Sequence, residues 1–170
     1  MTRLAIAATA LLAVAQSTVP WQPSFELVQP DLFAAPGGQA SAWADADGDG
    51  DLDYFVAFRG RPNRFYRNDS GIFREVAAEV GLADNHETRA AAWGDFDADG
   101  DPDLYLTLVL SALLGQGNQL YVNQGSDGAG GWIFTEEAVS RGVADDQTAY
   151  GPGWGDFDND GDQDLLVANG

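Results

Sequence analysis

The chain has 170 residues, of which 45% are hydrophobic and 11% aromatic, a composition typical of a globular domain. It carries 27 acidic residues against 8 basic ones, all of them arginine, for a formal charge of −19 at pH 7. This charge excludes nucleic acid as an expected partner, and anionic membranes too, because both need a basic surface. A cation is the ligand that such a chain favours.

Residues 1–15 have the order of an export signal. Arg3 precedes an apolar run over residues 4–14, and an Ala-Val-Ala cleavage site comes directly before Gln16. The apolar run is too short to cross a membrane, which takes roughly 20 residues, and no second run follows. We therefore expect residues 16–170 to form a protein that is secreted, periplasmic or on the cell surface, with no membrane span. The chain has no cysteine, so its stability must come from packing and metal rather than disulfides.

After the export signal, the sequence predicts short strands that are separated by turn residues. Residues 25–28 resemble the outermost strand of a sheet. Further strands are predicted at residues 40–44, 52–58, 64–67 and 72–76, with Gly, Pro, Asn and Asp between them. Residues 77–80 favour a helical turn, which is too short to cross over between parallel strands. These elements predict an all-β fold rather than an α/β fold.

One pattern occurs three times, at residues 43–53, 93–103 and 154–164. Each copy begins with Trp and then has Asp at every second position from its third residue. A second block also repeats, because residues 63–68 match 118–123 and residues 72–84 match 133–145. The second and third copies lie farther apart in the chain than the first and second copies do. This difference indicates insertions at residues 110–117 and 126–131, which are the expected variable surface.

Four strands in a repeat of about fifty residues are typical of one blade of a β-propeller. The third copy ends at Gly170, just after a predicted strand at 165–168, so the chain holds about two and a half blades. Closed propellers need about four to eight blades. The expected fold is therefore a partial β-propeller of four-stranded blades that is a fragment of a larger ring.

The three Asp-rich segments have the ligand pattern of a calcium loop. We call residues 45–53 loop 1, residues 95–103 loop 2 and residues 156–164 loop 3. Acids at positions 1, 3, 5 and 9 converge on one point, glycine at position 6 permits the bend, and the position 7 carbonyl adds an oxygen. Oxygen ligands without His or Cys favour Ca²⁺ over zinc or copper, and a flexible carboxylate ring favours it over magnesium. The predicted ligands for about three ions are Asp45, Asp47, Asp49, Asp51 and Asp53 in loop 1, Asp95, Asp97, Asp99, Asp101 and Asp103 in loop 2, and Asp156, Asp158, Asp160, Asp162 and Asp164 in loop 3.

An EF-hand is the competing interpretation of these loops. It requires a bidentate Glu at position 12, where this chain has Val56, Leu106 and Val167. The residues that follow each loop are also rich in β-formers, whereas an EF-hand loop is flanked by helices. The loops are therefore predicted to close on the ninth residue.

The pattern W-G-D-F-D-x-D-G-D-x-D-L, followed by N-x-L-Y-x-N and I-F-x-E, resembles the FG-GAP/VCBS repeat proteins. It is most similar to the bacterial relatives of cartilage acidic protein that carry an ASPIC/UnbV region, and the resemblance covers residues 24–170. It implies an integrin-α-like propeller, usually of seven blades, with calcium loops between the first two strands of a blade and a role in adhesion or extracellular recognition. Loop 1 departs from the pattern, because Ala44 and Ala46 stand where the other copies have Gly and Phe.

No catalytic constellation is visible in the sequence. His86 is the only histidine, and the chain lacks Cys, Lys and a G-x-S-x-G motif that could supply a nucleophile. Trp43, Trp93 and Trp154 are expected to pack between blades rather than to stack on sugars, because each precedes its loop by two residues. The leading interpretation is a non-catalytic module that binds an extracellular protein or glycan. The alternative is the propeller portion of a secreted carbohydrate-active enzyme or lectin, since fold alone does not separate the two.

Overall fold

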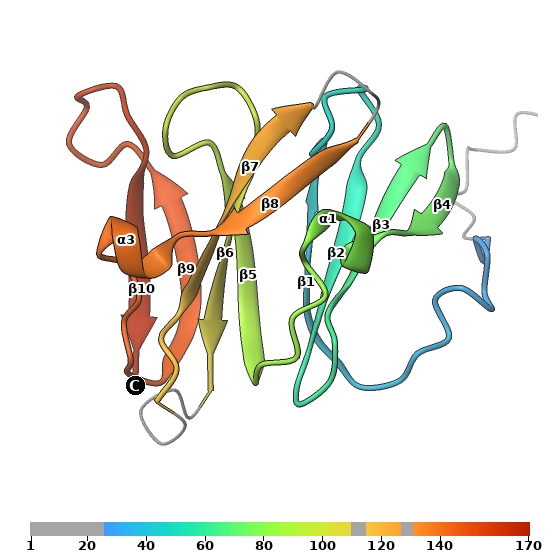
Figure 1. The fold of residues 1–170 in the computed structure, drawn as a ribbon, viewed down its shortest axis with the longest axis horizontal. Coiled ribbons are helices and arrows are strands. Elements are labelled where there is room, and N and C mark those ends of the chain that lie inside the picture. The colour runs from blue at the N-terminus through green and yellow to red at the C-terminus, as the bar shows by residue number, and fades with distance from the viewer. Residues whose placement is uncertain (1–25, 110–114, 127–130) are drawn as a thin grey trace, which may run out of the picture.

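A computed structural model describes residues 26–109, 115–126 and 131–170 of the chain. The predicted export signal at 1–15 lies outside these residues, as do Phe25 and most of the two predicted insertions. The described part contains three antiparallel sheets that follow one another along the chain (Figure 1).

The sheets correspond to successive blades, which we call blades 1, 2 and 3. Blade 1 consists of β1 (Gly38–Ala44), β2 (Asp53–Phe58), β3 (Arg64–Asp69) and β4 (Ile72–Glu75), in that order. Blade 2 consists of β5 (Thr88–Gly94), β6 (Asp103–Leu108), β7 (Gln119–Ser126) and β8 (Trp132–Glu136), and blade 3 pairs β9 (Ala149–Gly155) with β10 (Asp164–Asn169). The one-turn helices α1 (Ala77–Val80) and α3 (Ala138–Arg141) follow the last strands of blades 1 and 2. The fold is all-β and has the arrangement of a partial β-propeller.

The predicted strands between residues 40 and 76 are confirmed, and their ends agree with the structure within two residues. The helical turn at residues 77–80 is also confirmed as α1, and its C-cap Gly81 has a φ of +90°. Glycine reaches this left-handed conformation without the steric cost that other residues carry. The turn residues read from the sequence therefore mark the true ends of these elements.

The strand predicted at residues 25–28 is wrong for the part that is described, because residues 26–28 are not in a strand. The edge of β4 has another partner. The Gln29 side chain accepts a hydrogen bond from the Phe73 amide (2.6 Å) and donates one to the Phe73 carbonyl (2.9 Å). Phe33 then packs on Tyr66, with ring centroids 4.7 Å apart. A side-chain amide thus takes the place of a backbone partner at this edge, and Leu27 stays 87% exposed.

Apolar side chains fill the spaces between the blades. The larger cluster lies between blades 1 and 2 and includes Phe55, Phe65, Leu104, Leu106 and Phe134. Side chains of this size contribute about 1.5–3 kcal/mol each when fully buried. A second cluster, which includes Tyr105, Leu120 and Val122, packs against residues of blade 3. The blades are therefore held together mainly by packing of one sheet face on the next.

Two of the three repeated tryptophans lie between blades, as predicted. Trp93 of blade 2 contacts the rings of Phe55 and Phe65 in blade 1. Trp154 of blade 3 donates a hydrogen bond from Nε1 to the Ala92 carbonyl of blade 2 (3.3 Å). Trp43 differs: it stacks on Tyr54 of its own blade, with centroids 4.3 Å apart, and is 52% exposed.

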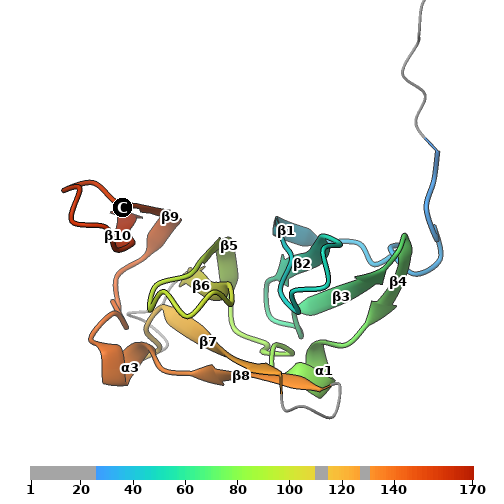
Figure 2. The ribbon, with the colours of Figure 1, turned by 90° about the horizontal axis from the view of Figure 1, so that it is seen from above.

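The arrangement of the blades places the three Asp loops together. Each loop connects the first two strands of its blade, and all three loops lie at the same end of the sheets, the upper end in Figure 1. The first strands of the blades contact one another, β1 with β5 and β5 with β9. Seen from above, these strands follow one side of an arc while the later strands spread outward (Figure 2). The loops therefore form one acidic rim.

Candidate metal centres

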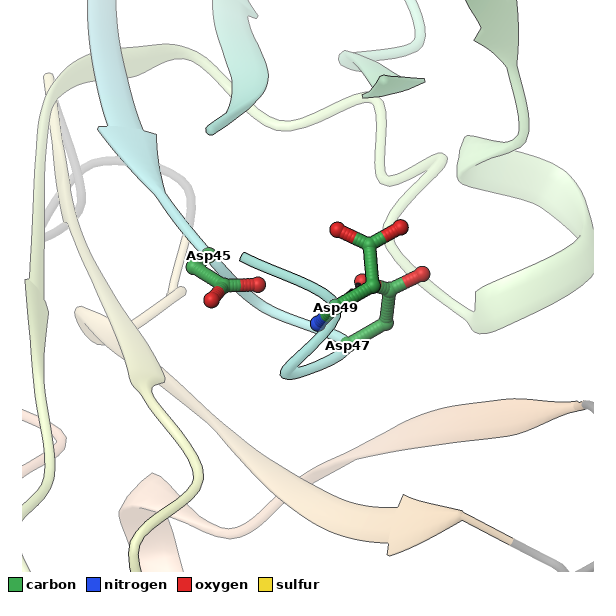
Figure 3. Close-up of side chains that lie close together, drawn as sticks. All are labelled: Asp45, Asp47 and Asp49. Carbon is green, nitrogen blue, oxygen red and sulfur yellow. Dashed lines mark hydrogen bonds between the residues drawn. The ribbon is translucent and has the colours of Figure 1, made fainter. Parts of the chain in front are cut away.

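Each loop gathers three carboxylates, from its first half in loops 1 and 2 and from positions 1, 3 and 9 in loop 3. In loop 1, one carboxylate oxygen from each of Asp45, Asp47 and Asp49 lies within 4.8 Å of the others (Figure 3). Oxygens this close are within reach of a single cation with ligand distances of 2.3–2.6 Å. Three carboxylate oxygens lie equally close in loops 2 and 3, where the residues are respectively Asp95, Asp97 and Asp99, and Asp156, Asp158 and Asp164.

The surroundings of one carboxylate oxygen in loop 1 indicate whether this cluster fits a metal ion. The Oδ1 atom of Asp45 is buried and has no hydrogen-bond partner. A buried carboxylate oxygen without a partner is costly, because it loses its hydration and gains nothing in exchange. The other oxygen, Oδ2, accepts a hydrogen bond from the Gly50 amide (3.0 Å), which fixes the direction of the carboxylate. The residues present therefore fit a hard cation at this point.

The backbone of the loops explains the glycine at position 6. Gly50, Gly100 and Gly161 have φ values of +94°, +98° and +99°. Each of these glycine amides also donates a hydrogen bond to the carboxylate at position 1, over 3.0 Å, 3.0 Å and 3.2 Å respectively. A side chain at position 6 would strain this conformation. The predicted role of this glycine is confirmed.

Position 4 has a conformation that the sequence analysis did not predict. Gly48, Ala98 and Asn159 occupy this position and have φ values of +71°, +57° and +63°. Glycine and asparagine tolerate the left-handed region, but alanine does so at a cost of about 1–2 kcal/mol. The signal was visible in the sequence, because two of the three loops have a turn-forming residue there.

Position 9 behaves differently in the three loops. The structure does not bring Asp53 and Asp103 into the clusters of loops 1 and 2, whereas Asp164 does belong to that of loop 3. Both oxygens of Asp53 accept backbone hydrogen bonds, from Ala46 (3.0 Å) and Asn68 (2.8 Å). Asp103 does the same with Phe96 (3.1 Å) and Asn123 (2.8 Å). These carboxylates close the loop and join it to the third strand. Their direct ligation, predicted from the spacing, stays a prediction.

Burial gives these two acids perturbed pKa values. Asp53 and Asp103 are 0% and 1% exposed. Burial raises the pKa of Asp53 to about 6 and that of Asp103 to about 7, although two backbone amides at each carboxylate oppose the rise. The acids at positions 3 and 5 add a smaller upward effect. Ionising these groups is therefore costly until a positive charge is placed in the loop.

Position 7 turns its side chain away from the cluster in loop 1. The Asp51 carboxylate accepts a hydrogen bond from the Ser70 amide (2.8 Å), which lies in the turn between β3 and β4. Neither Asp101 nor Asp162 belongs to the cluster of its loop. Asp160, at position 5 of loop 3, lies outside its cluster as well, although it was predicted as a ligand. The sequence pattern is therefore common to the three loops, while the positions of the side chains are not identical.

Two residues next to loop 1 were missed by the sequence analysis. The Asn123 amide group of blade 2 donates hydrogen bonds to the Ala46 carbonyl (2.8 Å) and the Pro102 carbonyl (3.3 Å), so it joins loops 1 and 2. The Arg67 guanidinium lies 3.2 Å from the Asp47 carboxylate. Both blades have Asn at the position of Asn123. At the position of Arg67, however, blade 2 has Val122. That difference was the available signal for Arg67.

The sheets and loops together define a β-propeller-type repeat module. Comparison with protein families agrees, because the model of an FG-GAP-like repeat matches residues 45–106. These residues run from the first aspartate of loop 1 into β6, so they cover one complete repeat period. A search of curated proteins found no match. Among the described residues, no helix is long and apolar enough to cross a membrane.

Proposed function

We propose that this chain is a secreted, non-catalytic β-propeller module that binds calcium through its three Asp loops and recognises an extracellular protein or glycan. The observation that carries the proposal is the carboxylate cluster of loop 1, with the unpartnered, buried Oδ1 atom of Asp45. The repetition of such clusters in loops 2 and 3 supports the same conclusion. We also propose the closer relation to proteins with an ASPIC/UnbV region, which rests on the pattern over residues 24–170.

The charges of the loop residues support a role for a cation. Asp45, Asp47 and Asp49 hold three carboxylate oxygens close together, and their mutual repulsion opposes the folded loop. The position 7 carbonyl is the further oxygen predicted to complete the ligand set, and position 9 fixes the loop to the sheet. A bound calcium ion would supply the positive charge that offsets this repulsion. Calcium then acts as a structural ion that holds the rim of the module in one conformation.

Calorimetric titration of the full chain with calcium tests the proposal. We expect about three ions to bind, one for each loop. A chain in which the first carboxylate of each loop is replaced by Asn should bind none, because each substitution removes a charged ligand. Preferential saturation by zinc, or no binding of calcium, would overturn the proposal. Export is tested separately, by sequencing the N-terminus of protein recovered outside the cytoplasm, where we expect Gln16 as the first residue.

A lectin-like function is the second candidate, and one surface favours it. A hollow of about 650 Å³ on blade 1 is lined by the rings of Trp43, Tyr54 and Phe73, among others. Half-exposed aromatic rings can stack on the apolar faces of sugars. Quenching or a shift of tryptophan emission on adding a glycan, lost in Trp43→Ala, would support this function. Unchanged emission across a glycan panel would exclude it for this surface.

A further inference from the structure

Arg67 is the one arginine in the described residues that forms an ion pair with an acid of an Asp loop. Its Nε atom lies 3.2 Å from Oδ2 of Asp47, at position 3 of loop 1. One of its two terminal nitrogens, Nη2, lies 2.5 Å from Oδ1 of Asp69. The side chain is 26% exposed and lines a hollow of about 180 Å³ between blades 1 and 2, together with Asp101 of loop 2. Arg67 is thus held at the junction of two acidic loops.

Asp69 also binds the guanidinium. It accepts hydrogen bonds from both Nε (3.0 Å) and Nη2 (2.5 Å) of Arg67. On the other side, the guanidinium carbon lies 5.7 Å from the centre of the Trp132 ring of blade 2. A charge-assisted pair and an aromatic face together fix the side chain better than a single surface ion pair would. These contacts hold the positive charge beside loop 1 in the metal-free chain.

The corresponding position of blade 2 has no charge. Tyr66 and Tyr121 occupy the same register in their sheets, opposite Glu75 and Glu136, so the next residues, Arg67 and Val122, are equivalent. Val122 is 3% exposed and belongs to the cluster between blades 2 and 3. Loops 1 and 2 therefore share their acidic pattern but differ in one fixed positive charge.

We infer that Arg67 is a built-in counter-cation that makes loop 1 a weaker calcium site than loop 2, so that the two loops fill in sequence as calcium rises. This inference rests on the proposed calcium binding. In the metal-free chain, Arg67 offsets part of the repulsion among the loop 1 carboxylates. A divalent ion at the same carboxylates repels the fixed guanidinium and competes with it for Asp47. In loop 2, no arginine of the described residues repels the ion or competes with it for a carboxylate.

The experiment replaces Arg67 by the residue that blade 2 uses. Loop 1 is isolated by measuring calcium binding in the full chain carrying Asp95→Asn and Asp156→Asn, the position 1 substitutions that are expected to abolish binding at loops 2 and 3. In this background we expect Arg67→Val to bind calcium at loop 1 about tenfold more tightly, as expected when a unit charge about 5 Å from a divalent ion is removed in a watery environment. Arg67→Lys keeps the charge and should restore the weaker binding.

A matched control separates local from overall charge. Arg59 pairs with Glu87 at the end of blade 1 remote from loop 1, so Arg59→Val removes the same charge and should leave loop 1 affinity unchanged. The metal-free melting temperature gives a second readout: Arg67→Val should lower it, because the carboxylates lose their counter-cation, and Arg67→Lys should restore it. If Arg67→Val does not fold by circular dichroism, Arg67→Gln serves for the same comparison.

The outcomes distinguish the inference from the function on which it rests. If the unaltered chain binds no calcium, the proposed function fails. If it binds calcium but Arg67→Val, or Arg67→Gln in its place, leaves loop 1 affinity equal or weaker, the role of Arg67 is wrong while the calcium function stands. Tighter binding in Arg59→Val of the same size would also overturn the inference, because overall charge would then explain the effect.

Discussion

Positions 3 and 7 of loop 2 carry the same charge but have different places in the structure. Asp97 belongs to the carboxylate cluster, whereas Asp101 lies outside it and borders the hollow near Arg67. We expect Asp97→Asn to weaken calcium binding at loop 2 by about tenfold or more, because it removes a charged ligand. Asp101→Asn should change it by less than about threefold, through long-range charge alone. Isothermal titration of the two variants checks this, and equal losses would show that bulk charge, and not this ligand set, governs the loop.

Position 4 of loop 2 offers a test of backbone strain. Ala98 has a φ of +57°, while the equivalent residue of loop 1 is Gly48. We expect Ala98→Gly to raise the free energy of unfolding by about 0.5–1 kcal/mol, since relief of the left-handed strain exceeds the added entropy of the unfolded chain. Ala78→Gly in α1 is the control and should lower stability by up to about 1 kcal/mol. Chemical denaturation measures both, and a loss of stability in Ala98→Gly would contradict the strain argument.

At the residue scale, the sequence identified the acids but not their exact partners. Alternate aspartates and a fixed glycine are visible as a pattern, so the clusters and the left-handed glycines could be predicted. The backbone bonds of Asp53 and the pairing of Asp47 with Arg67 depend on β3, which is brought beside the loop only by sheet formation. Contacts of this kind are not encoded in the spacing of the loop itself.

The interface between blades 2 and 3 depends on the absence of a side chain at Gly94. A Cβ atom built on Gly94 would lie 2.5 Å from the indole ring of Trp154, while one on Gly155 would meet no atom within 4 Å. We expect Gly94→Ala to destabilise the fold by about 1–3 kcal/mol through overpacking. Gly155→Ala, at the same position of the next blade, should be within about 0.5 kcal/mol of the unaltered chain.

Thermal unfolding of the two glycine variants separates packing from backbone effects, because neither glycine has a positive φ. A similar loss of stability in both would show that the interface with Trp154 is not the cause. The position occupied by Gly94 also differs between blades. Blade 1 has Ala44 where blade 2 has Gly94. Element positions could be predicted from turn residues, but this variation between blade interfaces could not.

Across the whole molecule, the buried acids predict how stability depends on pH in the absence of metal. The pKa of Asp103 is about 7 in the folded chain and near 3.8 when unfolded, so between these values the folded chain binds the additional proton. Raising the pH from 5 to 8 removes that proton and should lower the free energy of unfolding by about 2 kcal/mol, with Asp53 adding to the effect at the lower end.

Thermal melts in chelator and in excess calcium measure this dependence. In chelator the melting temperature should fall between pH 5 and pH 8. In excess calcium it should be higher at pH 8 than in chelator, because each site at a hundredfold excess over its dissociation constant adds about 2.7 kcal/mol. A melt that is independent of both pH and chelator would contradict the proposed role of the buried acids and of the ion.

The position of each Asp loop also has a consequence for the order of folding. Loop 1 joins β1 to β2, and these strands begin to pair directly at the loop, where Ala44 lies opposite Asp53. Loop 2 joins β5 to β6 in the same way. These hairpins are local contacts, whose formation needs little loop-closure entropy and precedes contacts between distant segments. The contacts of Trp93 and Trp154 with the preceding blade join residues much farther apart in the chain. Each blade is therefore expected to nucleate at its own acidic turn, and the tryptophans dock the blades onto one another afterwards.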